Sequence, residues 1–240
     1  MFSAVAQVEA GEHAREPERR ADVALSYSNS EIEVGLIQVA TTAYNRGNSP
    51  AELQLVAPAF VDAFRRAEAE GYDAAVPLGT LDLAVDAARS CVDIPVIGPA
   101  EAMLHLGCML GQRFGVLVYS HTSLVLCRRI VKQYEMTDKI VGWKVSGFHL
   151  PDIIANREKC LDNFVRHARE LVEENDAEVI LPMGITQCPV HINPVWLADQ
   201  LGVPVVEGIG APIRLAAMLV SLKLNYSRAF WPKSGLFKDK

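Results

Sequence analysis

Two stretches, "EVILPMGIT" (178–186) and "VPVVEGIGA" (203–211), decide the fold, because they repeat an earlier pair, "AAVPLGT" (74–80) and "IPVIGPAEA" (94–102). In both pairs a short apolar run ends on Pro-x-Gly, and a helical stretch follows. A second apolar run then leads into a helix that begins with small residues. Short apolar strands separated by helices are typical of βαβ units, in which a parallel sheet is buried on both faces. The repeat therefore predicts an α/β protein with two similar halves.

The same alternation extends over most of the chain. Apolar runs of strand length are separated by longer stretches with helical spacing of their apolar residues. We expect strands at 31–40, 74–79, 94–98, 113–120, 140–147, 178–184 and 203–208, and helices at 51–73, 81–90, 100–111, 122–134, 156–175, 194–201 and 211–222. These elements predict two pseudo-symmetric lobes, each a parallel sheet flanked by helices, with the active site in the cleft between them. The first lobe is expected to comprise 31–112 plus 203–240, and the second 113–202.

Residues 1–30 do not follow this pattern. They are rich in Glu, Arg, Ala and Ser and lack a sustained apolar period, which predicts a mostly disordered leader. A short helix is the alternative. The segment also lacks the apolar region and cleavage site of a secretory signal.

Composition limits the possible partners and the compartment. The net charge of -6 and the pI near 5.5 argue against a surface for nucleic acid or anionic membranes. The five cysteines are widely spaced without a CxxC pair, which argues against a disulfide framework and fits a reducing compartment. No apolar run approaches the ~20 residues of a membrane helix. We expect a soluble cytoplasmic protein that binds a small molecule and neither nucleic acid nor a membrane.

The two Pro-x-Gly turns are candidates for binding an anion or an oxyanion. A glycine at a strand-to-helix turn leaves backbone N–H groups unobstructed by a Cβ, and open α/β sheets bind ligands at the carboxyl ends of their strands. Thr80 follows Gly79 directly, and Thr186 lies two residues after Gly184. These groups are suited to stabilising developing negative charge. The alternative is that both threonines only cap tight turns.

Three side chains after the second turn are candidates for proton transfer. Cys188 lies four residues after Gly184 and three before His191, and a cysteine near a base acts as a nucleophile or acid–base group when its pKa is lowered. Most cysteines are instead small buried hydrophobes. Glu207 ends a strand, so its carboxylate is expected at the cleft mouth unless it is a solvated loop acid. Cys188, His191 and His149 lack the spacing of metal ligands, so no metal site is expected.

Further polar residues follow other strands and are candidates for positioning a substrate. Gln38, Thr41 and Asn45 lie at or after the end of the first strand, and Tyr119 and Ser120 end "VLVYS" (116–120). Ser120 is equally suited to capping the next helix.

No cofactor is expected. The stretch "VPVVEGIGAPIR" (203–214) has Gly208 and Gly210 after a strand, but Ile213 replaces the third glycine of a dinucleotide fingerprint.

The order of elements, the repeat, and the phrases "DIPVIGPAEAM" (93–103) and "GVPVVEGIGAPIRLA" (202–216) resemble the Asp/Glu/hydantoin racemase superfamily. The resemblance extends from residue 31 to about residue 222. In that family each half contributes one cysteine at the end of an equivalent strand. The two thiols remove and return a proton next to a carbonyl from opposite faces of the substrate. The resemblance also implies dimers or larger homo-oligomers.

The catalytic cysteines of that family have no counterpart in register here. Aligned by hydrophobic pattern, they fall on Gly79 and on Gly184, or on Met183 if the register slips by one. A methionine thioether has no ionisable proton. Arylmalonate decarboxylase, within the same superfamily, is similar in lacking the first cysteine and having a Gly-Thr there, like Gly79-Thr80. It stabilises an enediolate in an oxyanion pocket and protonates one face only.

The resemblance implies a cofactor-independent isomerase that acts next to a carbonyl on a small carboxylate or hydantoin-like substrate, through an enolate-like intermediate. In this reading Gly79–Thr80 and residues 184–186 stabilise the enolate oxygen, and Cys188, or else Glu207 or His191, transfers the proton. A lyase or hydrolase on the same scaffold and a non-catalytic small-molecule-binding protein are the alternatives.

Overall fold

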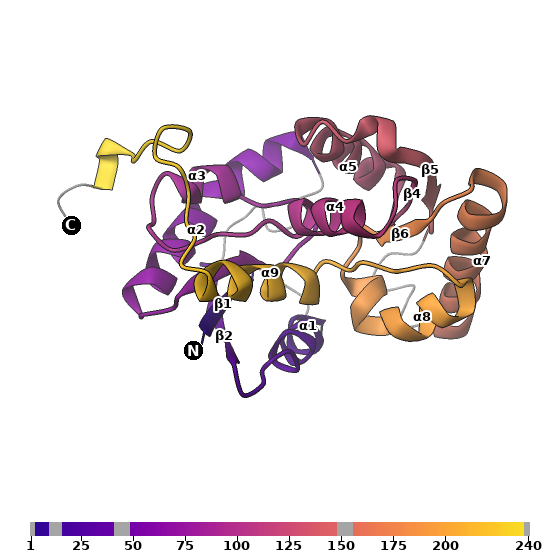
Figure 1. Cartoon of the computed structure of the whole chain (residues 1–240), viewed down its shortest axis with the longest axis horizontal. Helices are drawn as coiled ribbons and strands as arrows, with labels where there is room; N and C mark the ends of the chain where they lie inside the picture. Colours follow the sequence, from indigo (N-terminus) through magenta and orange to yellow (C-terminus); the bar gives the residue numbers. More distant parts are fainter. Residues whose placement is uncertain (1–2, 10–15, 41–48, 148–155, 238–240) are drawn as a thin grey trace. The chain divides into compact units, whose positions relative to one another are not determined.

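A computed structural model of the chain describes residues 3–9, 16–40, 49–147 and 156–237 (Figure 1). The chain divides into two compact units, Met1–Pro99 with Pro212–Lys240, and Ala100–Ala211. The predicted boundaries differed, because 100–112 and 203–211 were assigned to the first lobe. Both segments belong entirely to the second unit, so the helix that follows Val96 in the first repeat is grouped with the second repeat.

The first unit contains a parallel sheet in the order β2-β1-β3. Its strands are β1 (Ser3–Glu9), β2 (Ile32–Gln38) and β3 (Ala74–Pro77), and Val96 extends the sheet by a parallel bridge to Ala75. Helices α1 (Glu16–Leu25), α2 (Pro50–Ala69) and α3 (Val85–Arg89) follow these strands in turn. The unit's second segment begins within α9 (Gly210–Ser221), whose first two residues belong to the other unit.

The second unit repeats this order. Its sheet has the order β5-β4-β6, built from β4 (Phe114–Val118), β5 (Ile140–Val145) and β6 (Val179–Pro182), and Val205 extends it by a parallel bridge to Ile180. Its helices are α4 (Pro99–Leu110), α5 (His121–Gln133), α7 (Arg157–Asn175) and α8 (Pro194–Leu201), and shorter helical turns are η1 (Thr137–Lys139) and η2 (Thr186–His191). The predicted α/β repeat with parallel sheets is confirmed.

The prediction of a disordered leader is wrong. β1 lies in the middle of the first sheet, where Val5 pairs with Val34 on one side and with Ala74 on the other. The short helix weighed as the alternative is present as α1. The sequence pattern missed β1 because a run of seven residues followed by a charged segment carries too little apolar signal, and the strand is stabilised by both neighbours.

Each sheet is covered by helices whose apolar spacing matches the prediction. In α2 the buried residues are Val56, Phe60, Ala63, Phe64 and Ala67, which form one stripe at helical spacing. Ser49 caps this helix by accepting a hydrogen bond from the N–H of Glu52, and Pro50 occupies its first turn. In α7 the buried stripe consists of Cys160, Phe164, Ala168 and Leu171. No helix in the described ranges is both long and apolar enough to cross a membrane.

Candidate active site

The second Pro-x-Gly turn packs directly against Tyr119, which follows β4. The Tyr119 hydroxyl accepts a hydrogen bond from the N–H of Thr186 at 2.7 Å. A Cβ on residue 184 would lie 2.7 Å from Cζ of the Tyr119 ring, so the ring occupies the space that any side chain at Gly184 would need. The structure therefore brings together three predicted residues, Tyr119, Gly184 and Thr186, at the carboxyl end of the second sheet.

One backbone donor in this turn is left unused. The N–H of Gly184 donates to the carbonyl of Pro182 at 2.8 Å, and the N–H of Met183 donates to Leu117. Within the residues that the structure describes, the buried N–H of Ile185 has no acceptor. Buried N–H groups are almost always paired, so an unpaired one at the end of a strand marks a place where an acceptor atom of a ligand is favoured.

A buried amide network extends from the turn to the end of β5. The Gln187 side-chain amide donates to the hydroxyl of Ser146, and the Asn163 amide of α7 donates to the Ser146 carbonyl at 2.6 Å. Sequence reasoning missed Ser146 and Gln187 as part of this end of the sheet. Both follow strands, but only the fold brings residues so far apart in the sequence into contact.

Cys188 lies in the hydrophobic core of the second unit. Its side chain is fully buried among the core residues Leu117, Phe164, Ala168, Leu171, Ala177, Ile180, Ile192 and Leu197. Burial in this apolar environment raises the pKa of the thiol well above its ordinary value, and the nearby Glu207 carboxylate raises it further. A nucleophile or base needs the opposite, a lowered pKa and access. Contrary to the expectation of a proton-transfer role, these surroundings assign Cys188 a packing role.

Glu207 is buried, and it caps a helix. Its two carboxylate oxygens accept the N–H groups of Ile209 at 2.6 Å and Gly210 at 2.7 Å, at the start of α9. A carboxylate in this place accepts hydrogen bonds from N–H groups that have no partner within the helix, and its negative charge interacts favourably with the helix dipole. Its burial contradicts the alternative of a solvated loop acid, whereas a proton-transfer role of Glu207 stays a prediction.

His191 and Ser120 occupy different settings. His191 is half-buried at the end of η2, where it lines a small cavity together with Gln187 and Arg157. Ser120 caps α5 by accepting a hydrogen bond from the N–H of Ser123 at 3.2 Å, as the alternative for this residue predicted.

In the first unit, the turn after β3 carries unpaired donors. In the described part of the chain, the N–H groups of Gly79 and Thr80 and the Thr80 hydroxyl have no hydrogen-bond partner. Gly79 adopts a φ of +157°, which residues with a side chain rarely adopt. Thr80 is almost fully buried. Thr80 therefore does not cap the turn, contrary to the alternative weighed from the sequence. Its hydroxyl and N–H are available to a ligand.

The same turn contains a carboxylate that the sequence analysis did not single out. Asp82 has a φ of +49°, a left-handed conformation that costs energy for a residue with a side chain. Its carboxyl group packs against Gly98, where a Cβ would lie 2.5 Å from Cγ of Asp82. The sequence did contain a signal for this residue, since Asp82 lies only two residues after the candidate Gly79-Thr80 turn.

The remaining candidates are partly outside the described ranges. Gln38 is the exposed last residue of β2, and its carbonyl accepts a hydrogen bond from Arg66. Thr41, Asn45 and His149 lie outside the described residues. Among the described residues, no group of three or more His, Cys, Asp or Glu side chains is arranged to hold a metal ion.

Comparison with known proteins identifies the family to which the chain belongs. Residues 33–216 match the family model described as Asp/Glu/Hydantoin racemase, so the chain belongs to this family of enzymes. It is similar to the hydantoin racemase of Pseudomonas sp. (strain NS671), with 28% identity over 171 residues that cover 71% of this chain and 68% of the relative.

Solved structures agree with the fold. An allantoin racemase from Klebsiella pneumoniae superposes with a TM-score of 0.88 at 18% identity, covering 99% of this chain and 95% of that one. A structure of arylmalonate decarboxylase has a TM-score of 0.61 at 18% identity, covering 90% of this chain and 92% of that one. The resemblance to the racemase family noted from the sequence is confirmed.

Proposed function

We propose that this chain catalyses proton exchange at a carbon next to a carbonyl, on a hydantoin-like ring or a small carboxylate, through an enolate-like intermediate. The observation that supports this proposal is the set of unpaired backbone donors at Gly79 and Thr80 in one unit and at Ile185 in the other. Donors preorganised at the ends of strands stabilise an oxyanion as it forms, because folding has already oriented them and no reorganisation is needed during the reaction. The names of its relatives, hydantoin racemase and allantoin racemase, support the ring-shaped substrate class.

The proton is transferred without a thiol in this proposal. Gly79 and Gly184 occupy the positions where the family's cysteines were expected, and Cys188 is buried in the core. This proposal assigns the step to Asp82, two residues after Thr80, and to His191, at the end of η2 after the second turn. A carboxylate or imidazole removes the proton next to the carbonyl and returns it to the enolate carbon, so the substrate's atoms are conserved.

A lyase that loses carbon dioxide and forms the same enolate is the second candidate. The specific observation in its favour is Gly79-Thr80, which leaves donors but no acid–base group at the first cysteine position. Cleavage of a carbon–carbon bond leaves the electron pair on the enolate, which then needs a single protonation. The fold similarity to arylmalonate decarboxylase is compatible with this reaction.

One experiment separates these reactions. The protein is incubated in D₂O with 5-substituted hydantoins, amino acids and substituted malonates, and each substrate is followed by NMR. Deuterium at the carbon next to the carbonyl without net consumption supports the isomerase. Net loss of a malonate supports the lyase, and consumption of a hydantoin with ring opening supports a hydrolase. Binding without any turnover would contradict the proposed function.

The role of Thr80 is tested by a matched pair of variants. Thr80→Val removes the hydroxyl at nearly constant shape, and Thr80→Ser keeps it. Loss of one oxyanion donor lowers turnover by about 100- to 1000-fold. We therefore expect Thr80→Val to show such a loss while Thr80→Ser stays near the unmodified protein. Equal activity of both variants would exclude the Thr80 hydroxyl from the oxyanion site.

A further inference from the structure

The turn after β3 is held in a strained backbone conformation. Asp82 and Ala84 adopt φ angles of +49° and +57°, in the left-handed region that costs energy for residues with a side chain. Such a conformation persists only where the surrounding structure holds it. The equivalent turn after β6, residues 183–192, lies wholly within the described ranges and contains no residue in the left-handed region. The strain is therefore particular to the first repeat, and it includes one of the two residues to which proton transfer is assigned.

The carboxyl group of Asp82 lies against the backbone of Gly98. A Cβ on residue 98 would lie 2.5 Å from Cγ of Asp82 and 2.6 and 2.8 Å from its two carboxyl oxygens, so this group fills the place of a side chain. Gly98 ends the segment 94–98, in which Val96 forms the parallel bridge to Ala75 of β3. The position of the carboxyl group therefore depends on where the segment 94–98 lies.

The backbone of Val96 is held by two side chains. The Tyr226 hydroxyl accepts a hydrogen bond from the N–H of Val96 and donates one to its carbonyl at 2.7 Å. The buried guanidinium of Arg89 donates to the same carbonyl at 2.9 and 3.1 Å, and it lies over the rings of Tyr226 and Trp231. Tyr226 and Arg89 thus form a clamp on Val96, and the segment 94–98 is fixed between this clamp and β3.

The C-terminal segment that carries this tyrosine is anchored to the same unit at further points. Arg228 donates to the carbonyl of Val92 at 2.8 Å and forms an ion pair with Asp93 at 2.7 Å. The N–H of Ser234 donates to the carbonyl of Ser90 at 2.8 Å. In Figure 1 the segment, drawn in yellow after α9, runs past α3. The tyrosine hydroxyl is therefore presented to the sheet by a segment that is itself fixed.

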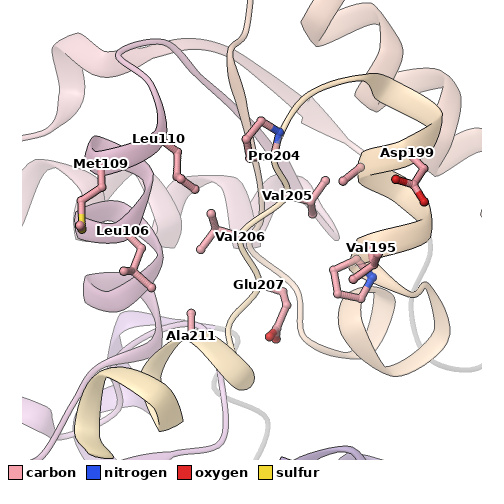
Figure 2. A pocket seen from close by; sticks show the side chains of 12 residues that line it. Leu106, Met109, Leu110, Val195, Asp199, Pro204, Val205, Val206, Glu207 and Ala211 are labelled. Atoms are coloured by element: carbon pink, nitrogen blue, oxygen red, sulfur yellow. The ribbon is translucent and has the colours of Figure 1, made fainter. Parts of the chain in front are cut away.

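The fold does not require such a clamp. In the second repeat Val205 has the place of Val96, since it forms the parallel bridge to Ile180 of β6. Figure 2 shows Val205 at the wall of a pocket of about 520 Å³ between α4 and α8. The second repeat thus pairs the equivalent segment with its sheet while a pocket lies beside it. The clamp occurs in the repeat that has the strained turn.

We propose that Tyr226 is a positioning residue for proton transfer. Its hydroxyl holds the segment 94–98 against β3, and through Gly98 this segment holds the Asp82 carboxylate at the strained turn. The inference rests on the proposed function, in which Asp82 transfers a proton. Because a misplacement of about 1 Å lowers turnover by about 100-fold, the hydrogen bonds between Tyr226 and Val96 affect the rate of the reaction.

A matched pair of variants measures this effect. Tyr226→Phe removes the hydroxyl and keeps the ring over which the Arg89 guanidinium lies. Tyr72→Phe is the control, because this half-buried hydroxyl lies against Gly35 of β2 in the same unit. With the substrate that shows exchange in D₂O, we expect Tyr226→Phe to lower kcat by about 10- to 100-fold and to leave KM nearly unchanged. Tyr72→Phe should leave both constants unchanged.

Hydrogen exchange followed by mass spectrometry tests the structural step without any substrate. Tyr226→Phe should raise the exchange rate of a peptide that covers the turn, residues 79–88, several-fold, whereas Tyr72→Phe should not. An unchanged rate in this peptide would overturn the inference even if the protein turned over no substrate. This result is therefore distinguishable from a failure of the proposed function.

Asp82→Asn separates positioning from a general loss of stability. This variant lacks the acid–base group, so adding Tyr226→Phe should lower its residual rate no further, whereas a loss caused by lower stability alone would appear in both backgrounds. Gly98→Ala, whose Cβ meets the same carboxyl group, replaces Asp82→Asn in this cycle if the latter has no measurable rate.

Three results would exclude the positioning role. The first is an equal loss of rate from Tyr226→Phe in both backgrounds, and the second is an unchanged kcat in Tyr226→Phe beside a slow Asp82→Asn. The third is full activity of Asp82→Asn, which would also remove Asp82 from the proposed function.

Discussion

The Tyr119 ring and Gly184 share one space: the ring lies where the Cβ of residue 184 would be, and the Tyr119 hydroxyl holds the N–H of Thr186 at 2.7 Å. Tyr119 thus fixes the turn that follows β6 from a position on the neighbouring strand's end. Gly184, one of the two positions on which the family resemblance places the second cysteine, is therefore closed to every side chain while Tyr119 keeps this rotamer.

This packing predicts the effect of a single methyl group. Gly184→Ala should destabilise the protein by about 1–3 kcal/mol, the usual cost of overpacking. The measurement is the urea midpoint of unfolding. In a Tyr119→Ala background the same substitution should cost much less, because the ring that it meets is gone. Gly235→Ala, where a Cβ meets nothing within 4 Å, is the neutral control. Equal costs of Gly184→Ala in both backgrounds would contradict the packing.

Cys188 should behave as a core residue. Because burial raises its pKa, the folded protein should hold it as an unreactive thiol at pH 8, while half-buried Cys108 is alkylated. Peptide mapping after iodoacetamide, with and without urea, measures this. Cys188→Ala should cost about 1–2 kcal/mol of stability and leave turnover unchanged. Loss of turnover in a folded Cys188→Ala variant would restore the catalytic assignment.

Glu207 should matter for stability through α9. Glu207→Ala leaves the N–H groups of Ile209 and Gly210 without their acceptor, and buried unpaired donors cost about 1–3 kcal/mol. Thermal unfolding followed by circular dichroism measures the loss. The exposed Glu173, on α7, provides the control substitution to alanine. A Glu207→Ala variant as stable as the Glu173 control would argue against the cap.

Acid should loosen the C-terminal segment. The hydrogen bond from Lys233 to Asp93, aided by Arg228, lowers the pKa of Asp93 below its ordinary value. A carboxyl group with a lowered folded pKa stabilises the native state at neutral pH, and this contribution is lost as pH falls below about 4. In a variant with Trp231 as its single tryptophan, fluorescence should change in that range.

The control for this pH dependence is Asp93→Asn, which cannot titrate. Its fluorescence should be flat across the same range and should resemble the acid form of the parent. A transition that persists in Asp93→Asn would assign the effect to another group.

The predictability of the site differs from residue to residue. The sequence singles out Gly79, Thr80, Gly184 and Thr186 because glycine and threonine after an apolar run are a local signal, and the repeat shows it twice. Cys188 and Glu207 were assigned chemistry because their residue types permit it. Their surroundings, a core and a helix N-terminus, come from distant segments. Local sequence carries residue type and spacing but not burial.

By itself, the sequence determined the internal repeat and the order of strands and helices from β2 to α9, because apolar periodicity and turn residues are local properties. The exceptions are the strands expected at 94–98 and 203–208, where the structure has only single parallel bridges at Val96 and Val205. Only the tertiary structure decided that β1 completes the first sheet, that the Tyr226 hydroxyl hydrogen-bonds to both the N–H and the carbonyl of Val96, and that Cys188 is a core residue. Each of these depends on contacts between segments far apart in the chain, and the free energy of such contacts is determined by what packs nearby.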